Sequence, residues 1–374
     1  MKIGILTLPL ETNYGGNLQA FALQKIVKEM GHEVITVDRH RRKQYSSFFE
    51  HFVIYLRRLY LKHIRNKKIS TKWNPFLSEK EYEEVSSLIQ PFIHNNINLT
   101  RRIYLEQIQE IDEEYKFDAY IVGSDQVWLD QYCPSSFLDF VKRKDVIKIA
   151  YAASAGKRSF FNNHSKTNVC KKLAKDFDGI SVREDYLVDM CEKKLNIKAS
   201  FVLDPTMLLD PNDYLSITSN NVGCTPIIFS YILDSSVHKD RILDFVAKQM
   251  NISIVAGNRN GSSKIFPSVD DWIYNIDRSK YVITDSFHGT AFAILFNKPF
   301  ITIGNKNRGI QRFVSLLKIF NLQDRLIFED SAYDIESLIN KPINYKEVND
   351  ILEKQRKLSV SFILNLLDSK KGVF

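Results

Sequence analysis

Short apolar runs alternate along the chain with segments whose apolar residues recur at helical spacing. Residues 2–8 form the first apolar run, and a polar loop at 9–16 leads into a helical pattern that begins at Asn17. Gly31 is expected to end this helix, because glycine readily takes the left-handed conformation that closes a helix. Residues 33–38 then predict a second strand. A strand, a helix and a strand in this order indicate a βαβ unit with a parallel sheet.

The same alternation fills both halves of the chain. A polar stretch at 216–223 marks the best boundary between them. We therefore expect an α/β fold of two Rossmann-like, doubly wound domains that face a central cleft. Their expected limits are 1–208 and 209–344, and a helix within 345–374 would pack back on the first domain. Further strands are predicted at 119–122, 147–151, 180–182, 201–203, 227–233, 252–256, 281–284 and 300–303.

The length and the cysteines narrow the class of protein. A chain of 374 residues is long enough for two domains that need neither a disulfide nor a metal to stabilise them. The four cysteines, at positions 133, 170, 191 and 224, include no CxxC pair of the kind that holds zinc. The first residues lack the features of a signal peptide, and no apolar run reaches the roughly 18 residues that span a bilayer. We expect a cytoplasmic location.

Positive charge is concentrated in one segment. The chain carries 52 Lys and Arg against 44 Asp and Glu, a net charge of +8, and residues 39–72 hold eleven of the cations with a single acid, Glu50. The remainder is nearly neutral, which argues against a nucleic-acid partner. Segment 39–72 is also rich in aromatic and aliphatic residues, a composition typical of an anionic membrane interface. Alternatively, Tyr55, Leu56 and Leu59 pack on the core and the cations form a solvated face.

In parallel sheets, ligands bind outside the carboxyl ends of the strands, so the loops there should hold the functional residues. The first such loop ends in Gly15, Gly16 and Asn17 at the start of a helix. Free N–H groups and the helix dipole favour an anion at this position. The same glycines would equally serve a loop that only needs to turn tightly.

Two later loops carry further polar groups. The loop after strand 119–122 offers Asp125, Gln126 and Trp128, and a carboxylate, an amide and an indole together suit a sugar. Asp125 could equally cap the turn that follows it. Another loop carries His288 at a helix start, where the dipole disfavours the cationic ring and leaves a proton acceptor. A buried structural histidine is the alternative.

Cations follow two other strands. Arg183 could bind a carboxylate or a phosphate through its planar fork, or it could pair with its neighbours Glu184 or Asp185. Lys306 and Arg308 would complete an anion site from the second half, or they would lie in a solvated turn. The sequence leaves both pairs of alternatives open.

Five motifs, in order and at family-like spacing, resemble the polysaccharide pyruvyl transferase family. They are the opening MKIGILTLPLETNYGGNLQAFALQ, the runs FDAYIVGSDQVW and AYAASAG, the pair SVRE and LDP, and VITDSFHGTAFAILFNKPFITIG. The resemblance implies a GT-B-like pair of domains. It also implies transfer of pyruvate from phosphoenolpyruvate onto a sugar of a polysaccharide or a lipid-linked glycan precursor, as a cyclic ketal with release of phosphate. No metal is expected, and no cofactor besides phosphoenolpyruvate as co-substrate.

The resemblance also implies roles for individual residues. Where many members have Ser-Arg-Leu-His, this chain reads Asp285-Ser286-Phe287-His288, so Ser286 replaces an anion-binding arginine. His288 would shuttle protons. The full set comprises His288 and Asp125 as catalytic residues, Arg183, Gly15, Gly16, Asn17, Ser286, Lys306 and Arg308 as donor-binding residues, and Asp125, Gln126 and Trp128 as acceptor-binding residues.

Two other classes of function fit the same architecture, because a fold does not determine a reaction. A glycosyltransferase that uses a nucleotide sugar would need an acid for the ribose, and Glu329 or Asp330 could supply it. A non-catalytic glycan-binding relative would keep the fold alone. The expected partners are phosphoenolpyruvate, a glycan acceptor and, through segment 39–72, an anionic membrane surface. A lipid-linked acceptor would place the protein at the inner face of the cytoplasmic membrane.

Overall fold

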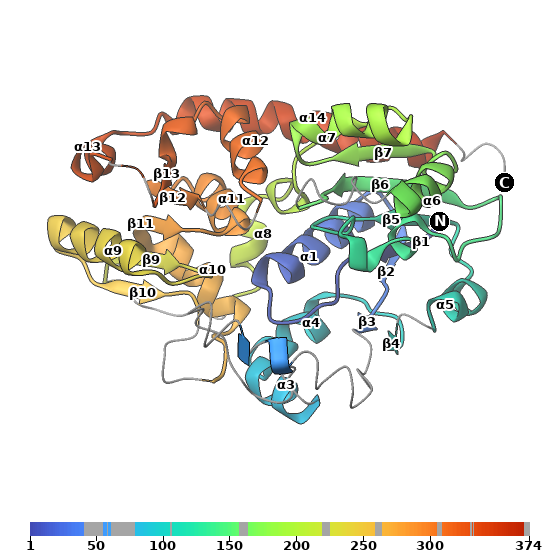
Figure 1. Ribbon diagram of the computed structural model, residues 1–374, viewed down its shortest axis with the longest axis horizontal. Coiled ribbons are helices and arrows are strands. Elements are labelled where there is room, and N and C mark those ends of the chain that lie inside the picture. Colours follow the sequence, from blue (N-terminus) through green and yellow to red (C-terminus); the bar gives the residue numbers. More distant parts are fainter. Residues whose placement is uncertain are drawn as a thin grey trace.

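The computed structural model describes residues 1–40, 55–57, 59–60, 79–104, 107–156, 164–218, 225–258, 264–304, 309–329, 331 and 333–369. Within these residues, two parallel sheets lie side by side with helices packed on them (Figure 1). The strand order is β2-β1-β5-β6-β7-β8 in the first sheet and β10-β9-β11-β12-β13 in the second. Strands β3 and β4 form a small separate pair.

The first unit is built on a sheet whose strands are largely buried. Helices pack on such a sheet, which is why a strand such as β5 is a continuous apolar run and every residue of β6 is buried. Its strands are β1 (Lys2–Leu6), β2 (Glu33–Thr36), β5 (Ala119–Val122), β6 (Ile147–Ala153), β7 (Gly179–Val182) and β8 (Ser200–Phe201), beside β3 (Arg39–His40) and β4 (Ile103–Tyr104). Its helices are α1 (Tyr14–Glu29), α3 (Glu79–Ser86), α4 (Gln90–Asn96), α5 (Ile108–Tyr115), α6 (His164–Ala174) and α7 (Asp185–Met190), with short turns η2 (Asp130–Tyr132), η3 (Ser135–Phe137), η5 (Cys191–Leu195) and η6 (Pro205–Met207).

The second unit repeats this plan on a smaller sheet. Its strands are β9 (Ile227–Tyr231), β10 (Ile254–Ala256), β11 (Ser279–Thr284), β12 (Phe300–Gly304) and β13 (Leu326–Phe328). The helices of this part of the chain are α8 (Pro211–Leu215), α9 (Val237–Met250), α10 (Val269–Arg278), α11 (Phe287–Leu295), α12 (Gln311–Ile319), α13 (Ile335–Asn340) and α14 (Tyr345–Asp368), with the turn η8 (Gln323–Arg325).

In each sheet the chain adds its second strand on one side of the first strand and the later strands on the other side. Strand β2 lies on one side of β1 and β5 on the other, and β10 and β11 flank β9 in the same way. Sheets of this kind bind ligands beside this change of side, at the carboxyl ends of the strands. The loops after β1, β5, β9 and β11 are therefore the ones that the fold places for function.

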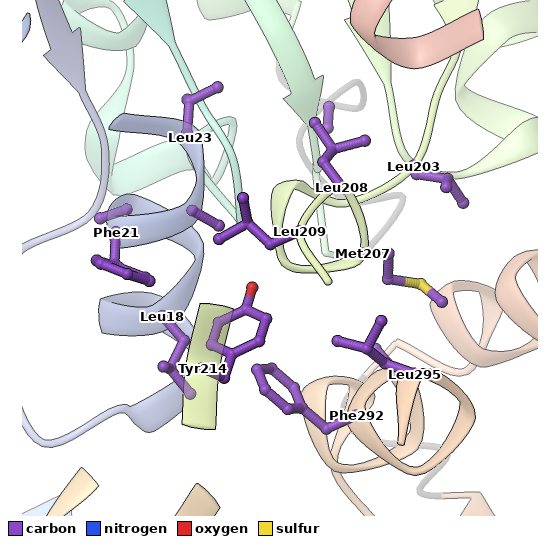
Figure 2. Packing of buried hydrophobic residues seen from close by; sticks show 14 of the residues in the cluster. Leu18, Phe21, Leu23, Leu203, Met207, Leu208, Leu209, Tyr214, Phe292 and Leu295 are labelled. Atoms are coloured by element: carbon purple, nitrogen blue, oxygen red, sulfur yellow. The ribbon is translucent and has the colours of Figure 1, made fainter. Parts of the chain in front are cut away.

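A hydrophobic cluster joins the two units. The ring of Tyr214 in α8 lies 4.9 Å from that of Phe292 in α11 and 6.1 Å from that of Phe21 in α1, measured between centroids. Figure 2 shows these rings together with Met207 and Leu295. Full burial of each such side chain contributes about 1.5–3 kcal/mol. The cluster therefore holds α1 of the first unit against α11 of the second.

The last helix, α14, bridges both units along one side of the molecule (Figure 1, red). The hydroxyl of Tyr345, at its start, donates to the carbonyl of Lys298 in the second unit. Further along, Ser359 accepts a hydrogen bond from the backbone N–H of Leu203 at 3.0 Å. Among the described residues, no helix is long and apolar enough to cross a membrane.

The predicted α/β class with two Rossmann-like units is confirmed. Strand 119–122 has the predicted limits, whereas the helix expected from Asn17 already begins at Tyr14. Strand β13 and helix α12 were not predicted. The strand spans only Leu326–Phe328, which is too short to show a period of two residues.

Candidate active site

The loops after β1 and β11 meet at Gly15 and His288. Each residue is the second of its helix, α1 and α11 respectively. A Cβ atom on Gly15 would lie only 2.0 Å from Nδ1 of His288, so no larger residue permits this approach. A Cβ atom on Gly16 would lie 3.2 Å from the Asn13 amide, a weaker restriction. The donor-binding glycines predicted from the sequence thus include the one against which His288 packs.

Hydrogen bonds fix the turn that carries His288. Ser286 is the N-cap of α11, and its hydroxyl accepts a bond from the N–H of Gly289 at 3.4 Å. Its own N–H donates to Oγ1 of Thr284 at 3.0 Å. Ser286, predicted as a donor-binding residue, therefore has a structural task in the position where the family often has arginine.

Asp285, the residue before this cap, is engaged within the second unit. Its carboxylate accepts bonds from the N–H groups of Leu233 at 2.6 Å and Asp234 at 3.1 Å, and it pairs with Lys239 at 2.7 Å. The Lys239 ammonium also lies 3.3 Å from Glu329. Because Glu329 has this partner, the candidate ribose-binding acid is part of a structural cluster.

Arg183, at the end of β7, joins two buried carboxylates. Its Nη2 lies 2.8 Å from Oδ1 of Asp125, and its Nη1 lies 2.7 Å from Oδ2 of Asp204. The carboxylate of Glu184 is 3.7 Å from its Nε. The guanidinium carbon also lies 4.4 Å from the centroid of the Phe287 ring, which belongs to the second unit. Both ends of the fork are therefore occupied from within the protein.

Two alternatives from the sequence are resolved by these contacts. Asp185 does not pair with Arg183, because its carboxylate accepts a bond from Ser315 at 2.8 Å and lies 3.2 Å from Lys318, both in α12. Asp125 does not cap the next turn with its side chain; it pairs with Arg183 across the site. Of the two neighbours, Glu184 does pair with Arg183, at 3.7 Å, and the shorter ion pairs of Arg183 reach Asp125 and Asp204.

Asp204 is where the charged network meets His288. Its Oδ2 accepts bonds from Arg183 and, at 3.1 Å, from the hydroxyl of Ser124, and it lies 3.7 Å from Nε2 of His288. Its Oδ1 accepts two bonds from Thr206, at 3.0 and 2.8 Å. In the part of the chain that the structure describes, the buried Nε2 of His288 has no hydrogen-bond partner. The hydrogen-bonding capacity of this nitrogen is therefore not used by the described residues.

The electrostatics keep the centre ionised. Burial alone would raise the pKa of Asp125 and of Asp204, but the positive charges of Arg183 and His288 hold both pKa values below the usual range of an aspartate. Burial would lower the pKa of Arg183, but the surrounding carboxylates raise it above its ordinary value. Burial raises the pKa of Glu184. The two aspartates therefore remain charged partners of Arg183.

A second guanidinium, that of Arg312 in α12, lies at the same junction and was not predicted. With the amide of Gln126 oriented to present its oxygen, that oxygen accepts a bond from Arg312 at 2.5 Å. Burial and, after it, the charge of Arg183 lower the pKa of Arg312 to about 10. Just before α12, Gly309 lets the chain of the second unit pass close to Gly156 of the first unit. Its φ is +78°, and a Cβ there would lie 2.1 Å from the carbonyl oxygen of Gly156. The cations predicted from the sequence, Lys306 and Arg308, lie in the loop after β12, a few residues before Arg312.

Two predicted site residues lie in the interior. Trp128 is fully buried and stacks on Phe137 with a centroid distance of 5.1 Å, so its ring packs in the core and presents no open face to a sugar. Asn17 is also fully buried, and its amide donates to the carbonyl of Glu11 at 2.8 Å. In this arrangement both residues hold loops in place.

Three other predicted residues, Lys306, Arg308 and Asp330, lie outside the described residues. Within the described residues, no group of three or more His, Cys, Asp or Glu side chains is arranged to hold a metal ion. The groups that the junction does bring together are a histidine, two guanidiniums and three carboxylates.

The paired sheets place the protein in the GT-B-like class, in which two Rossmann-like units face each other. Two solved structures share this fold. UDP-GlcNAc 2-epimerase from Neisseria meningitidis bound to UDP-GlcNAc is 10% identical with a TM-score of 0.52, covering 99% of this chain and 100% of that one. A putative UDP-N-acetylglucosamine 2-epimerase from Listeria monocytogenes is also 10% identical with a TM-score of 0.52, covering 100% and 97%. At this identity the likeness concerns the fold alone.

The family follows from the sequence. The model of the polysaccharide pyruvyl transferase family matches residues 13–307, well over half of the chain. The chain therefore belongs to the polysaccharide pyruvyl transferase family. Comparison with curated proteins gave no significant match. Membership makes the protein a transferase of polysaccharide biosynthesis, with a polysaccharide as acceptor.

Proposed function

We propose that the protein transfers pyruvate from phosphoenolpyruvate to two hydroxyl groups of a glycan, forming a cyclic ketal and releasing phosphate. The observation that carries the proposal is the position of His288. This histidine of the family motif lies at the junction of the two units, and its buried Nε2 lies 3.7 Å from Asp204 without a hydrogen-bond partner among the described residues. A reaction that must move protons needs such a group.

The reaction sets three tasks. The methylene carbon of phosphoenolpyruvate takes up a proton, which leaves an oxocarbenium-like carbon; two sugar hydroxyl oxygens then bond to this carbon as the bond to phosphate breaks. Of the two hydroxyl protons, one balances the proton gained by the methylene and the other leaves with the phosphate. The site must therefore transfer protons, bind a trianion and orient a diol.

Proton transfer is proposed for Nε2 of His288. The ionised Asp204 faces this nitrogen and would stabilise the protonated ring, so that His288 can deliver a proton to the methylene and regain one from a hydroxyl. Asp125 is proposed to orient a sugar hydroxyl, and Gln126 would assist it from the same loop. Because Arg183 lowers the pKa of Asp125, this carboxylate would act mainly as a hydrogen-bond acceptor.

Donor binding is proposed for the two guanidiniums. Arg183 and Arg312 come from different units and repel each other at this junction. A donor that carries both a carboxylate and a phosphate would offset this repulsion; because both ends of the Arg183 fork already hold aspartates, Arg183 would contribute through its charge. Lys306 and Arg308 remain proposed contributors. The start of α1 at Gly15, Gly16 and Asn17, with Ser286, remains a proposed contributor as well.

The test combines binding and turnover. We expect phosphoenolpyruvate, and none of a panel of nucleotide sugars, to raise the melting temperature of the protein. With a suitable glycan acceptor, His288→Ala should lower the rate of phosphate release by about 10² to 10⁴ while phosphoenolpyruvate still stabilises the variant. His94→Ala, which removes an exposed histidine of α4, is the matched control and should keep the full rate.

Other outcomes favour the competing functions. Stabilisation by a nucleotide sugar but not by phosphoenolpyruvate would favour a glycosyltransferase. Stabilisation by glycans alone would favour a non-catalytic glycan-binding relative. Wild-type turnover in His288→Ala would remove this residue from the mechanism.

We also propose that segment 39–72 contacts an anionic membrane surface when the acceptor is lipid-linked. Most of this segment lies outside the described residues. Among those described, the side chains of Leu56 and Tyr60 are 47% and 46% exposed, and the segment as a whole has a charge excess of +10. Anionic lipids attract each nearby Lys or Arg by roughly 1 kcal/mol, so several cations together would give reversible binding.

A further inference from the structure

Arg39, in β3 of the first unit, is a buried cation that pairs with none of the carboxylates that the structure describes. Only 2% of its surface is exposed, and none of its three guanidinium nitrogens has a hydrogen-bond partner within the described parts of the chain. The neighbouring Asp38 lies 3.1 Å from His40 and 3.5 Å from Arg102, so it is engaged elsewhere. The contact that remains is with Tyr132, whose ring centroid is 4.9 Å from the guanidinium carbon.

This arrangement is unfavourable unless an anion completes it. A guanidinium has five N–H donors, and burying an ionised group without partners costs several kcal/mol. Burial lowers the pKa of Arg39 to about 10, so the group is still charged at neutral pH. A cation–π contact stabilises the guanidinium by less than this cost and cannot offset it. Local conflicts of this kind are expected at functional sites.

The position of Arg39 in the fold is also one where ligands bind. Arg39 follows β2, and Tyr132 follows the loop after β5; β2, β1 and β5 are adjacent in the parallel sheet. Both residues therefore come from the carboxyl ends of strands, the same edge that carries Asp125. This edge belongs to the first unit, whereas Arg312, proposed to bind the donor, comes from the second.

We propose that Arg39, stacked on Tyr132, forms a subsite for an anionic substituent of the polysaccharide acceptor, a phosphate or a carboxylate. The inference rests on the proposed function, because it takes the acceptor to be a glycan. The ring of Tyr132 contacts one face of the guanidinium and leaves the N–H groups at its edge for two oxygen atoms of an oxyanion.

The test compares charged and neutral sugars on the full-length chain by titration calorimetry. The probes are a hexose 1-phosphate, a hexuronate, the neutral hexose and phosphoenolpyruvate. We expect the wild type to bind at least one charged sugar ten or more times more tightly than the neutral one. Arg39→Gln should abolish this preference. Arg102→Gln, which removes an arginine whose side chain is 43% exposed beside the same Asp38, should keep it.

Each result counts for or against the subsite. If Arg39→Gln does not fold, as judged by circular dichroism, Arg39→Lys keeps the charge and loses the planar fork, and a weaker preference is then expected. The titrations with the hexose 1-phosphate and with the hexuronate show whether the subsite binds a phosphate or a carboxylate. Equal binding of charged and neutral sugars to the wild type, or an unchanged preference in the folded Arg39 variants, would overturn the subsite. Phosphoenolpyruvate should bind equally to all variants; its failure to bind any of them would count against the proposed function instead.

Discussion

Removing the charge of Arg183 is the sharpest perturbation of the buried network. Arg183→Met keeps an aliphatic side chain but leaves Asp125 and Asp204 without their cation. The side chain of Arg183 is 1% exposed, and its contacts of 2.8 and 2.7 Å are ion pairs with ideal hydrogen-bond distances. The variant therefore removes the closest ion-pair partner of two buried carboxylates, which keep His288 as a neighbour, and a third carboxylate, that of Glu184, lies nearby.

The expected magnitude follows from this geometry. Removing one partner of a buried pair destabilises a protein by about 3–5 kcal/mol, because the other charge stays buried. In a unit of this size, each kcal/mol corresponds to roughly 2–4 °C in melting temperature. The free energy of unfolding of Arg183→Lys should lie between those of the wild type and Arg183→Met. An ammonium keeps the charge but cannot reach both aspartates through one planar group.

The assay is urea unfolding at several pH values, with Arg101→Met as the matched control. Arg101 also pairs with two acids, Glu110 and Glu114, but its side chain is 39% exposed. Exposed ion pairs contribute little to stability, so the free energy of unfolding of the control should stay close to that of the wild type. The comparison separates the loss of a buried charge from the loss of any arginine.

The pH dependence gives the sign of the effect. In the wild type the pKa values of Asp125 and Asp204 are lowered by folding, so their stabilising contribution is present above the unfolded value of about 3.9 and is lost as the pH falls through the folded values. Without Arg183, burial should raise the pKa values of Asp125 and Asp204 in the folded variant above their unfolded values. The folded variant then binds more protons than the unfolded chain, so lowering the pH favours folding. The difference in free energy of unfolding should be largest at neutral pH and should narrow toward about pH 4. A wild-type midpoint for Arg183→Met at pH 7, or a difference that does not vary with pH, would refute this reasoning.

Two further predictions concern the junction and the basic segment. Gly15→Ala should reduce turnover about 100-fold or more, because its Cβ would displace the ring of His288. Gly16→Ala is the control, and turnover is measured as phosphate release. Equal rates for the two variants would contradict the packing argument. Wild-type protein should sediment with anionic liposomes in a salt-sensitive manner through segment 39–72, and Arg57→Glu should weaken this; complete recovery of both proteins in the supernatant would exclude membrane contact.

Much of the candidate site was visible in the sequence because strand ends are local features. Apolar runs locate the strands, and the residue after a parallel strand lies at the ligand-binding edge. This rule found Asp125, Arg183 and His288, and the structure brings all three into one network with distances of 2.7–3.7 Å to their neighbours. Asp204 follows β8 and obeys the same rule, but it was noticed only as part of a motif.

The sequence alone determined the α/β class and the family, because both depend on periodicity and on motifs that are read along the chain. The tertiary structure decided the partners. Arg183 and Asp125 are 58 residues apart, and their pairing depends on β6 lying between β5 and β7. Burial of Trp128 and the solitary charge of Arg39 likewise depend on neighbours that arrive from elsewhere in the sequence. A side chain's polarity is local, but the groups that satisfy it are set by packing, and packing exists only in three dimensions.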